Sequence, residues 1–261
     1  MDILLAFLVV SAIGLIAGVL LALASHFMAV PDDETVKKVR EALPGVNCGA
    51  CGYTGCDEYA KAITNEGAKI NLCIPGADAV SQEIANIMGT EFQDVVEMMA
   101  YVHCNGNCEA TSSKVHYDGQ MTCRSANLLY GGPGKCRFGC LGCGDCARAC
   151  PVGAICLKDG IAHVNPKICI GCGLCVSDCP KGIISLIPQV SKIGVMCSSE
   201  DKGAVAMKNC KNACIGCKKC ENTCPNGAIM VENNLAKIDY SLCTACGKCA
   251  EVCPTKCIHK L

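Results

Sequence analysis

The sequence predicts an α+β protein in which an N-terminal transmembrane helix precedes three cysteine-rich parts. Three observations support this prediction. Residues 3–25 form an uncharged apolar run, cysteine accounts for 28 of the 261 residues, and one cysteine motif occurs four times in two pairs. Between the paired motifs lie short alternating segments with turn residues, which indicate β-hairpins beside short helices.

The uncharged run has the length of a membrane anchor. As a helix it would extend about 35 Å, enough to cross a hydrocarbon core. A secretory signal would begin with basic residues and have a shorter apolar run, whereas only Met1 and Asp2 precede this one. Lys37, Lys38 and Arg40 follow it. We therefore expect a single-pass protein of the inner (cytoplasmic) membrane, held by the lipid bilayer, with the cysteine-rich parts on the cytoplasmic side.

Changes in cysteine spacing divide the rest of the chain. The expected parts are an anchor (1–30), a charged linker (31–43), a cysteine module (44–100), a cysteine-containing bridging segment (101–137), a first repeat unit (138–190), a second bridging segment (191–211) and a second repeat unit (212–261). Residues 181–261 carry eleven Lys and six acidic residues. This excess fits either an ordinary solvated surface or a docking face for an acidic partner.

The repeated motif is Cys-x2-Cys-x2-Cys-x3-Cys-Pro, the spacing of bacterial ferredoxins that bind 4Fe-4S clusters. In such a pair, three thiolates from one loop bind three corners of a cubane, and the other motif supplies the fourth. Small residues inside the loops, such as Gly142 and Gly171, let backbone N–H groups approach the cluster. Zinc sites use separated cysteine pairs instead. We therefore predict two bacterial-type 2x(4Fe-4S) ferredoxin-like units.

The spacing assigns four clusters to the cysteines of these motifs. The expected ligand sets are Cys140, Cys143, Cys146 and Cys179; Cys169, Cys172, Cys175 and Cys150; Cys214, Cys217, Cys220 and Cys253; and Cys243, Cys246, Cys249 and Cys224. A disulfide scaffold is the alternative interpretation of so many cysteines. The repeated triplets closed by Cys-Pro favour clusters over disulfides.

A fifth group of four cysteines has a different spacing. Cys48-x2-Cys51-x4-Cys56-x16-Cys73 begins in a Gly-rich loop, and short helices are expected after it. Four soft ligands fit either zinc or an iron–sulfur cluster. The spacing favours the cluster and leaves zinc open.

Eight cysteines remain without a motif. Cys123-x12-Cys136-x3-Cys140 is echoed by Cys197-x12-Cys210-x3-Cys214, so the duplication extends upstream of each unit. A further cluster could be held by Cys104, Cys108, Cys123 and Cys136, the preferred arrangement, or by the pairs Cys123/Cys136 and Cys197/Cys210. Free structural thiols are the third possibility. We expect Cys156 and Cys257 to be small buried packing residues. The chain would thus hold at least five 4Fe-4S clusters, and six or more with such a site.

Several motifs are missing. Residues 131–136 lack the phosphate-loop spacing, and no Gly-x-Gly-x-x-Gly follows a predicted strand. No pair of side chains indicates a catalytic dyad. We therefore expect no nucleotide or flavin site, no nucleic-acid partner and no substrate turnover by this chain alone.

The loop at residues 47–56 reads Asn-Cys-Gly-Ala-Cys-Gly-Tyr-Thr-Gly-Cys. An anchor, this loop and then ferredoxin motifs, in that order, closely resemble the B subunit of the Rnf complex, above all the long variants with two ferredoxin units. The resemblance covers essentially the whole chain and implies that Cys48, Cys51, Cys56 and Cys73 bind a 4Fe-4S cluster. Pro-Gly-Ala follows Cys73-Ile74 where family members often have Pro-Gly-Gly.

The resemblance also implies a function. Such a subunit would take electrons from reduced ferredoxin and pass them to membrane subunits of a ferredoxin:NAD oxidoreductase that translocates Na⁺ or H⁺. Flavin and NAD would be handled by other subunits, in agreement with the missing motifs. The alternative is the electron-input subunit of a membrane hydrogenase or formate dehydrogenase, against which the loop at 47–56 argues.

Overall fold

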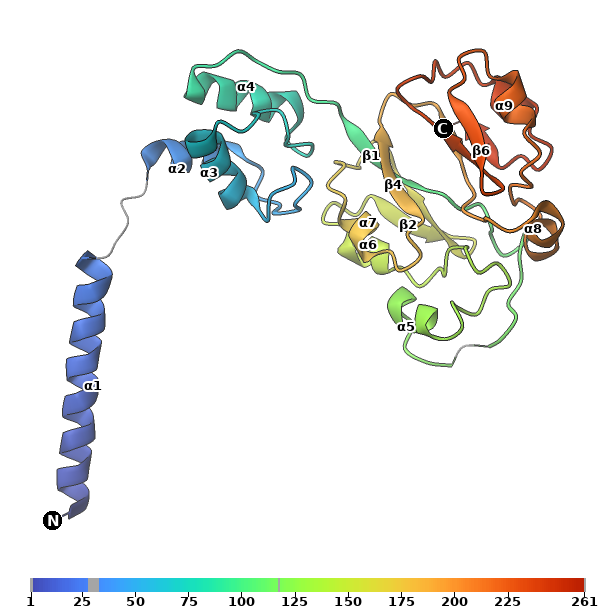
Figure 1. Ribbon diagram of the computed structural model, residues 1–261. Coiled ribbons are helices and arrows are strands. Elements are labelled where there is room, and N and C mark those ends of the chain that lie inside the picture. The colour runs from blue at the N-terminus through green and yellow to red at the C-terminus, as the bar shows by residue number, and fades with distance from the viewer. Residues whose placement is uncertain (1, 28–32, 117, 261) are drawn as a thin grey trace.

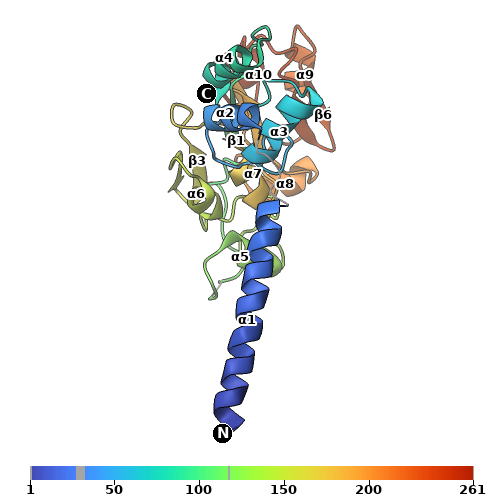
Figure 2. The ribbon, with the colours of Figure 1, turned by 90° about the vertical axis from the view of Figure 1, so that its left-hand side faces the viewer.

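The computed structural model describes residues 2–27, 33–116 and 118–260. Helix α1 (Asp2–Phe27) is uninterrupted, and its segment 7–24 is long and apolar enough to cross a membrane. None of that segment is buried inside the protein, and the helix extends away from the rest of the chain in Figures 1 and 2. An apolar helix without a protein partner fits a lipid environment. The expected junction of anchor and linker, at residues 28–32, lies outside the described residues.

Three helices build the first cysteine module, namely α2 (Glu34–Ala42), α3 (Cys56–Glu66) and α4 (Ala77–Met88). Their apolar faces meet in one core around Val39, Tyr59 and Ile84. Helices α3 and α4 end at Gly67 and Gly89, whose left-handed conformation costs glycine little. The core therefore holds the loops that carry the cysteines.

Helix α2 lies in the segment expected to be a linker. Asp33 caps it by accepting a hydrogen bond from the Thr35 N–H at 2.8 Å, and Val39 is fully buried. The helix has nine residues and a charged outer face. Val36, Val39 and Leu43 stand at helical spacing and pack into the core of the module, so a short amphipathic pattern does mark this helix in the sequence.

The two ferredoxin-like units contain the same elements in the same order. The first has β1 (Met98–Val102), α6 (Asp145–Ala149), β2 (Ile155–Lys158), β3 (Ile161–Val164), α7 (Leu174–Asp178) and β4 (Ile184–Pro188); the second has β5 (Ile193–Val195), α9 (Lys219–Thr223), β6 (Ile229–Glu232), β7 (Leu235–Ile238), α10 (Lys248–Glu251) and β8 (Ile258–Lys260). Helices α5 (Cys123–Leu128) and α8 (Gly203–Asn209) follow the first strand of each unit. The α+β fold class is confirmed.

Each unit has two antiparallel two-stranded sheets. The first strand pairs with the last, as β1 with β4 and β5 with β8, and the middle strands form the hairpins β2–β3 and β6–β7. The hairpin turns fall at Asp159-Gly160 and Asn233-Asn234, all with positive φ. The first strands depart from the expected boundaries, because β1 crosses residue 100 and β5 lies in the segment expected to be a bridge.

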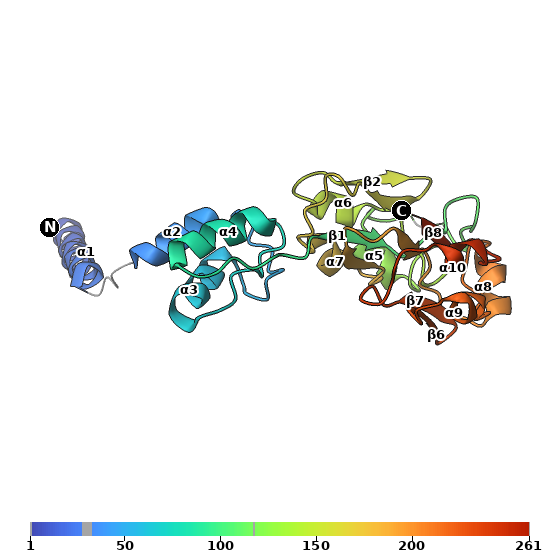
Figure 3. The same cartoon turned by 90° about the horizontal axis from the view of Figure 1, so that it is seen from above.

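The three parts follow one another in a row. Figure 3 shows the first module between α1 and the first unit, and the second unit beyond it. A small apolar cluster with Met99, Tyr101 and Ile187 at its centre lies at the junction of the two units. There the Tyr101 ring packs against Gly194 of β5, where no larger residue would fit. The two units are therefore in direct contact.

Candidate iron–sulfur centres

The four cysteines of the first module converge beside the start of α3. Cys56 is its first residue, and the Cys56 N–H donates to Asn47 Oδ1 at 2.9 Å. Burial, together with the nearby thiols of Cys56, Cys48 and Cys51, raises the pKa of the Cys73 thiol to about 11. The structure thus brings together the four residues that the spacing selected.

Tyr59 of α3 fixes the loop that leads to Cys73. This residue is 1 % exposed. Its hydroxyl donates to the Lys69 carbonyl oxygen at 2.7 Å and accepts from the Leu72 N–H at 3.1 Å. One side chain therefore holds both ends of a short backbone segment just before the fourth cysteine.

We expect Tyr59→Phe to loosen this module selectively. The change leaves a carbonyl and an N–H without their partner, at a cost of about 1–3 kcal/mol. Iron should leave the first module faster under a chelator, while the ferredoxin-like units lose iron at the unchanged rate. Anaerobic chelation followed by absorbance and EPR measures this. Tyr130→Phe is the control, because Tyr130 is exposed; equal rates in both variants would contradict the role of Tyr59.

The first site of the first unit gathers five thiols. Cys140, Cys146 and Cys179 line one pocket together with Cys123 of α5. The Cys143 thiol also contacts Cys123 and interacts with Cys140. The four residues selected by the motif are thus together, and Cys123, which was expected in a bridging site, lies beside them.

The second site of this unit takes its fourth cysteine from the first motif. The Cys175 thiol interacts electrostatically with those of Cys169, Cys172 and Cys150. Backbone N–H groups also reach the sulfurs, as Ala100 N lies 3.3 Å from Cys169 Sγ and Ala154 N lies 3.2 Å from Cys150 Sγ. Such N–H···S contacts stabilise cluster-bound thiolates and tune their potential.

The second unit repeats this exchange. One pocket is lined by Cys214, Cys217, Cys220 and Cys253, and another by Cys224, Cys243, Cys246 and Cys249. The loops of the four motifs share a backbone conformation, because Gly142, Gly171, Gly216 and Ala245 all have φ between 55° and 69°. A common loop geometry at all four triplets fits a common ligand.

The cysteines are not arranged for a single metal ion. Among the described residues, no group of three or more His, Cys, Asp or Glu side chains could hold one. A cubane presents four separate irons, so its thiolates stand farther apart than those around one ion. The donor sets therefore fit clusters better than zinc.

Of the other cysteines outside the motifs, four line a common pocket and three lie elsewhere. Cys104, Cys136, Cys197 and Cys210 line one further pocket between the units. Cys108 is exposed and does not line this pocket; its backbone N–H donates to the Asp159 carbonyl. Cys257 is buried as expected, with its sulfur 3.6 Å from Cys253 Sγ. Cys156 is exposed, against expectation, because the outer face of the β2–β3 hairpin is uncovered.

The first module lies against the second site of the first unit. The thiols of Cys48 and Cys172 interact electrostatically. A Cβ on Gly171 would lie 2.8 Å from Ile74 Cγ2. Since Ile74 directly follows Cys73, two cysteine loops from different parts pack together.

A helix of membrane-spanning length, a four-cysteine module and two ferredoxin-like units with exchanged fourth cysteines define a multicluster iron–sulfur electron-transfer protein. The family model described as "Putative Fe-S cluster" matches residues 43–75, and the 4Fe-4S dicluster domain matches residues 139–183 and 213–257. The chain therefore carries 4Fe-4S clusters.

Relatives that match 90% of the chain narrow the class. The chain is 43% identical over 236 residues, 90% of this chain and 71% of the relative, to the B subunit of the Na(+)-translocating ferredoxin:NAD(+) oxidoreductase complex of Acetobacterium woodii. It is 40% identical to the proton-translocating counterpart of Clostridium ljungdahlii, covering 90% and 84% of the two chains. It is 37% identical to the B subunit of the ion-translocating oxidoreductase complex of Methanosarcina acetivorans, covering 90% of both. The chain belongs to this family, the B subunits of Rnf complexes.

Proposed function

We propose that this chain relays electrons from reduced ferredoxin to membrane subunits of an Rnf-type complex. The complex would couple ferredoxin oxidation and NAD reduction to Na⁺ or H⁺ translocation, with flavin and NAD bound by other subunits. The names of the relatives support this partnership, since they describe ferredoxin:NAD(+) oxidoreductases that translocate Na⁺ or protons. By itself the chain would exchange electrons and transform no substrate.

We further propose that the ligands are the cysteines of the five sites described above. These are Cys48, Cys51, Cys56 and Cys73 in the first module, and the four sets of the ferredoxin-like units. The observation that carries the relay is the packing of the first module against the first unit, where Ile74 lies beside Gly171 and the Cys48 thiol interacts electrostatically with that of Cys172. Within that unit Cys146 interacts with Cys175 across its two sites.

The membrane end of this path would be the first module. It follows α1, which would cross the cytoplasmic membrane once, and the basic residues Lys37, Lys38 and Arg40 lie in α2, ten to thirteen residues after the end of α1. Basic residues next to a membrane helix favour the cytoplasmic side. The clusters would then face the compartment that contains soluble ferredoxin.

The direct test uses the full chain in detergent or nanodiscs under anaerobic conditions. Reduced ferredoxin is expected to bleach the cluster absorbance of the chain within the mixing time of a stopped-flow experiment. Membrane partners added afterwards should reoxidise the clusters. Clusters that stay oxidised in the presence of reduced ferredoxin would contradict the proposal, even if the iron content is complete.

The second unit offers a basic entry point for ferredoxin. Cys217 is exposed, and the neighbouring Lys218 and Lys219 line the same pocket. The double change Lys218→Glu and Lys219→Glu is expected to slow reduction by ferredoxin about tenfold at low ionic strength, since steering by opposite charge raises association rates. The effect should shrink as salt screens the charges.

Stopped-flow reduction over a range of salt concentrations measures this. The matched control is the double change Lys158→Glu and Lys167→Glu, which alters the charge equally on exposed positions of the first unit. Equal slowing in both double variants would mean that net charge, and not this site, controls docking.

A further inference from the structure

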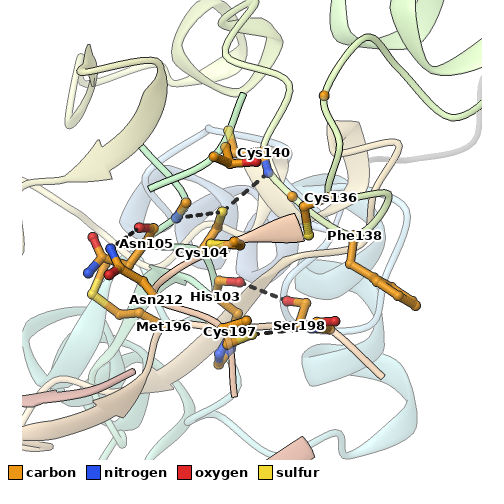
Figure 4. A pocket seen from close by; sticks show the side chains of 17 residues that line it. His103, Cys104, Asn105, Cys136, Phe138, Cys140, Met196, Cys197, Ser198 and Asn212 are labelled. Atoms are coloured by element: carbon orange, nitrogen blue, oxygen red, sulfur yellow. Dashed lines mark hydrogen bonds between the residues drawn. The ribbon is translucent and has the colours of Figure 1, made fainter. Parts of the chain in front are cut away.

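Four cysteines outside the motifs surround one pocket at the junction of the two ferredoxin-like units. Cys104, Cys136, Cys197 and Cys210 all line it, and Figure 4 labels the first three there. The Cys136 thiol interacts electrostatically with each of the other three. A Cβ on Gly106 would lie 3.4 Å from Cys210 Sγ and 3.6 Å from Cys104 Sγ, so these sulfurs flank one glycine.

The four cysteines are two copies of one pair. Cys104 comes two residues after β1, and Cys197 two residues after β5. Cys104 Sγ accepts from Cys140 N at 3.3 Å, and Cys197 Sγ from Cys214 N at 3.2 Å. Each sulfur also accepts, at 3.4 Å, the N–H two residues ahead in the chain. Each unit thus contributes the cysteine that follows its first strand and the cysteine four residues before its first motif.

This pairing replaces both arrangements expected from the sequence. The first of them used Cys108 and Cys123, and the second used Cys123 with Cys136. Cys108 is exposed beside the β2–β3 turn, and Cys123 lies with the Cys140 set. The structural equivalent of Cys197 is Cys104.

Hydrogen bonds across the junction hold the loops that carry these cysteines. Asn105 N donates to the Met196 carbonyl at 3.0 Å, and Lys211 N to the Ala110 carbonyl at 2.9 Å. Asn212 Nδ2 donates to the Asn105 carbonyl at 2.8 Å. The four thiols therefore lie on two backbone segments, one from each unit, that hydrogen bonds hold in a fixed relative position. A metal centre bound by both units requires such a fixed arrangement.

His103, the one histidine that lines this pocket, is already hydrogen-bonded through both ring nitrogens. Its Nδ1 lies 2.8 Å from the Val195 carbonyl and its Nε2 lies 2.7 Å from Ser185 Oγ. Neither nitrogen is free to bind a metal. Buried sulfurs that receive two N–H groups each are suited to thiolates whose charge a metal centre compensates.

The position of the pocket selects the kind of centre. Four soft ligands accept zinc or an iron–sulfur cluster. The N–H groups that bind Cys104 and Cys197 belong to Cys140 and Cys214, the first cysteines of a motif in each unit. A metal centre in this pocket would therefore lie next to a cluster of each unit. Zinc could not transfer electrons between those clusters, whereas an iron–sulfur cluster could.

We propose that Cys104, Cys136, Cys197 and Cys210 bind a further 4Fe-4S cluster that transfers electrons between the two ferredoxin-like units. It would take one electron from a reduced cluster of one unit, which is thereby oxidised, and give one electron to an oxidised cluster of the other; no bond or proton changes place. This inference rests on the proposed relay and completes it, since it places a carrier where the two units meet.

The metal content of the full chain, purified anaerobically, is the first test. Six clusters correspond to about 24 iron atoms and about 24 sulfides per chain, without zinc. About 20 iron atoms with one zinc, or about 20 with no other metal, would overturn the bridging cluster and leave the five-cluster relay intact. A chain without iron would overturn both proposals. This measurement needs no variant to fold.

Single variants locate the centre. Cys136→Ala and Cys197→Ala are each expected to remove about four iron atoms and one EPR signal of the reduced protein. The double variant should lose no more iron than either single one, because the two residues, one from each unit, share one cluster. Cys108→Ala is the matched control and should lose none. Unchanged iron in both single variants, or a double variant that loses twice as much, would overturn the proposal.

Discussion

A chain with Cys150→Ala is expected to lose the cluster of the more distant triplet and to keep the cluster of its own motif. Cys150 follows Cys146 by four residues, yet its thiol interacts with Cys172 and Cys175. The loss is about four iron atoms per chain. In the proposed path this cluster lies between the first module and all other clusters, so reduced ferredoxin should no longer reduce the first module during turnover.

Double variants identify which cluster is lost. Cys150→Ala combined with Cys169→Ala should lose no more iron than Cys150→Ala alone, because both changes act on one cluster. Combined with Cys140→Ala, it should lose about twice as much, since two clusters are then affected. Cys156→Ala is the control, an exposed cysteine of β2. The reverse pattern of the two doubles would show that Cys150 binds its own motif.

The sequence predicted the ferredoxin-like units well because their cysteines obey a local rule. The three cysteines of a triplet lie in one short loop, so their spacing along the chain determines how they are arranged around a cluster. The turn residues of the hairpins have the positive φ that Asn, Asp and Gly tolerate. The structure brings together the same twenty thiols that the spacing grouped. The first module could also be located, since its four cysteines lie in one short segment around α3.

The first strands and the junction pocket could not be predicted in this way. Strand β5 has three residues and pairs with β8 at the other end of the unit, so no local pattern marks it. Strand β1 is separated from its motif by a long insertion that contains α5. Sequence position therefore placed both strands outside the units to which their hydrogen bonds assign them.

The same insertion misdirected the pairing of the unassigned cysteines. Cys123 precedes Cys136 by the spacing that separates Cys197 from Cys210, which made Cys123 and Cys197 look equivalent. The true equivalence follows from the strands, since Cys104 and Cys197 each come two residues after the first strand of a unit. Cysteine spacing measures distance along the chain, whereas strand pairing fixes where a residue lies in the fold. The insertion in the first unit changes the first without changing the second, so spacing alone matched the wrong cysteines.

Gly171→Ala is expected to weaken the contact between the first module and the first unit. Gly171 has φ of 65°, and its added Cβ would meet the Met98 carbonyl oxygen and would lie 2.8 Å from Ile74 Cγ2. The left-handed backbone costs alanine about 1–2 kcal/mol. Overpacking adds about 1–3 kcal/mol, because a backbone oxygen cannot turn away as a side chain can.

A matched glycine separates these two costs. Gly153 has φ of 64°, and a Cβ there would meet nothing within 4 Å. Gly153→Ala should therefore show only the backbone cost and leave electron transfer to the first module unchanged. Adding Ile74→Ala to Gly171→Ala removes one of the two clashes and should restore part of the loss. Midpoints of anaerobic thermal cluster loss measure the stability difference, and stopped-flow reduction of the first-module cluster measures the coupling.

The expected electronic effect follows from where the clash falls. Ile74 adjoins Cys73 of the first module, and Gly171 lies between Cys169 and Cys172 of the neighbouring site. A shift forced between these loops separates the two centres that the proposed path joins through Cys48 and Cys172. Electrons should then accumulate in the ferredoxin-like units while the first module stays oxidised. If Gly171→Ala and Gly153→Ala reduce the first module equally fast, electrons reach it by another route and this contact is only structural.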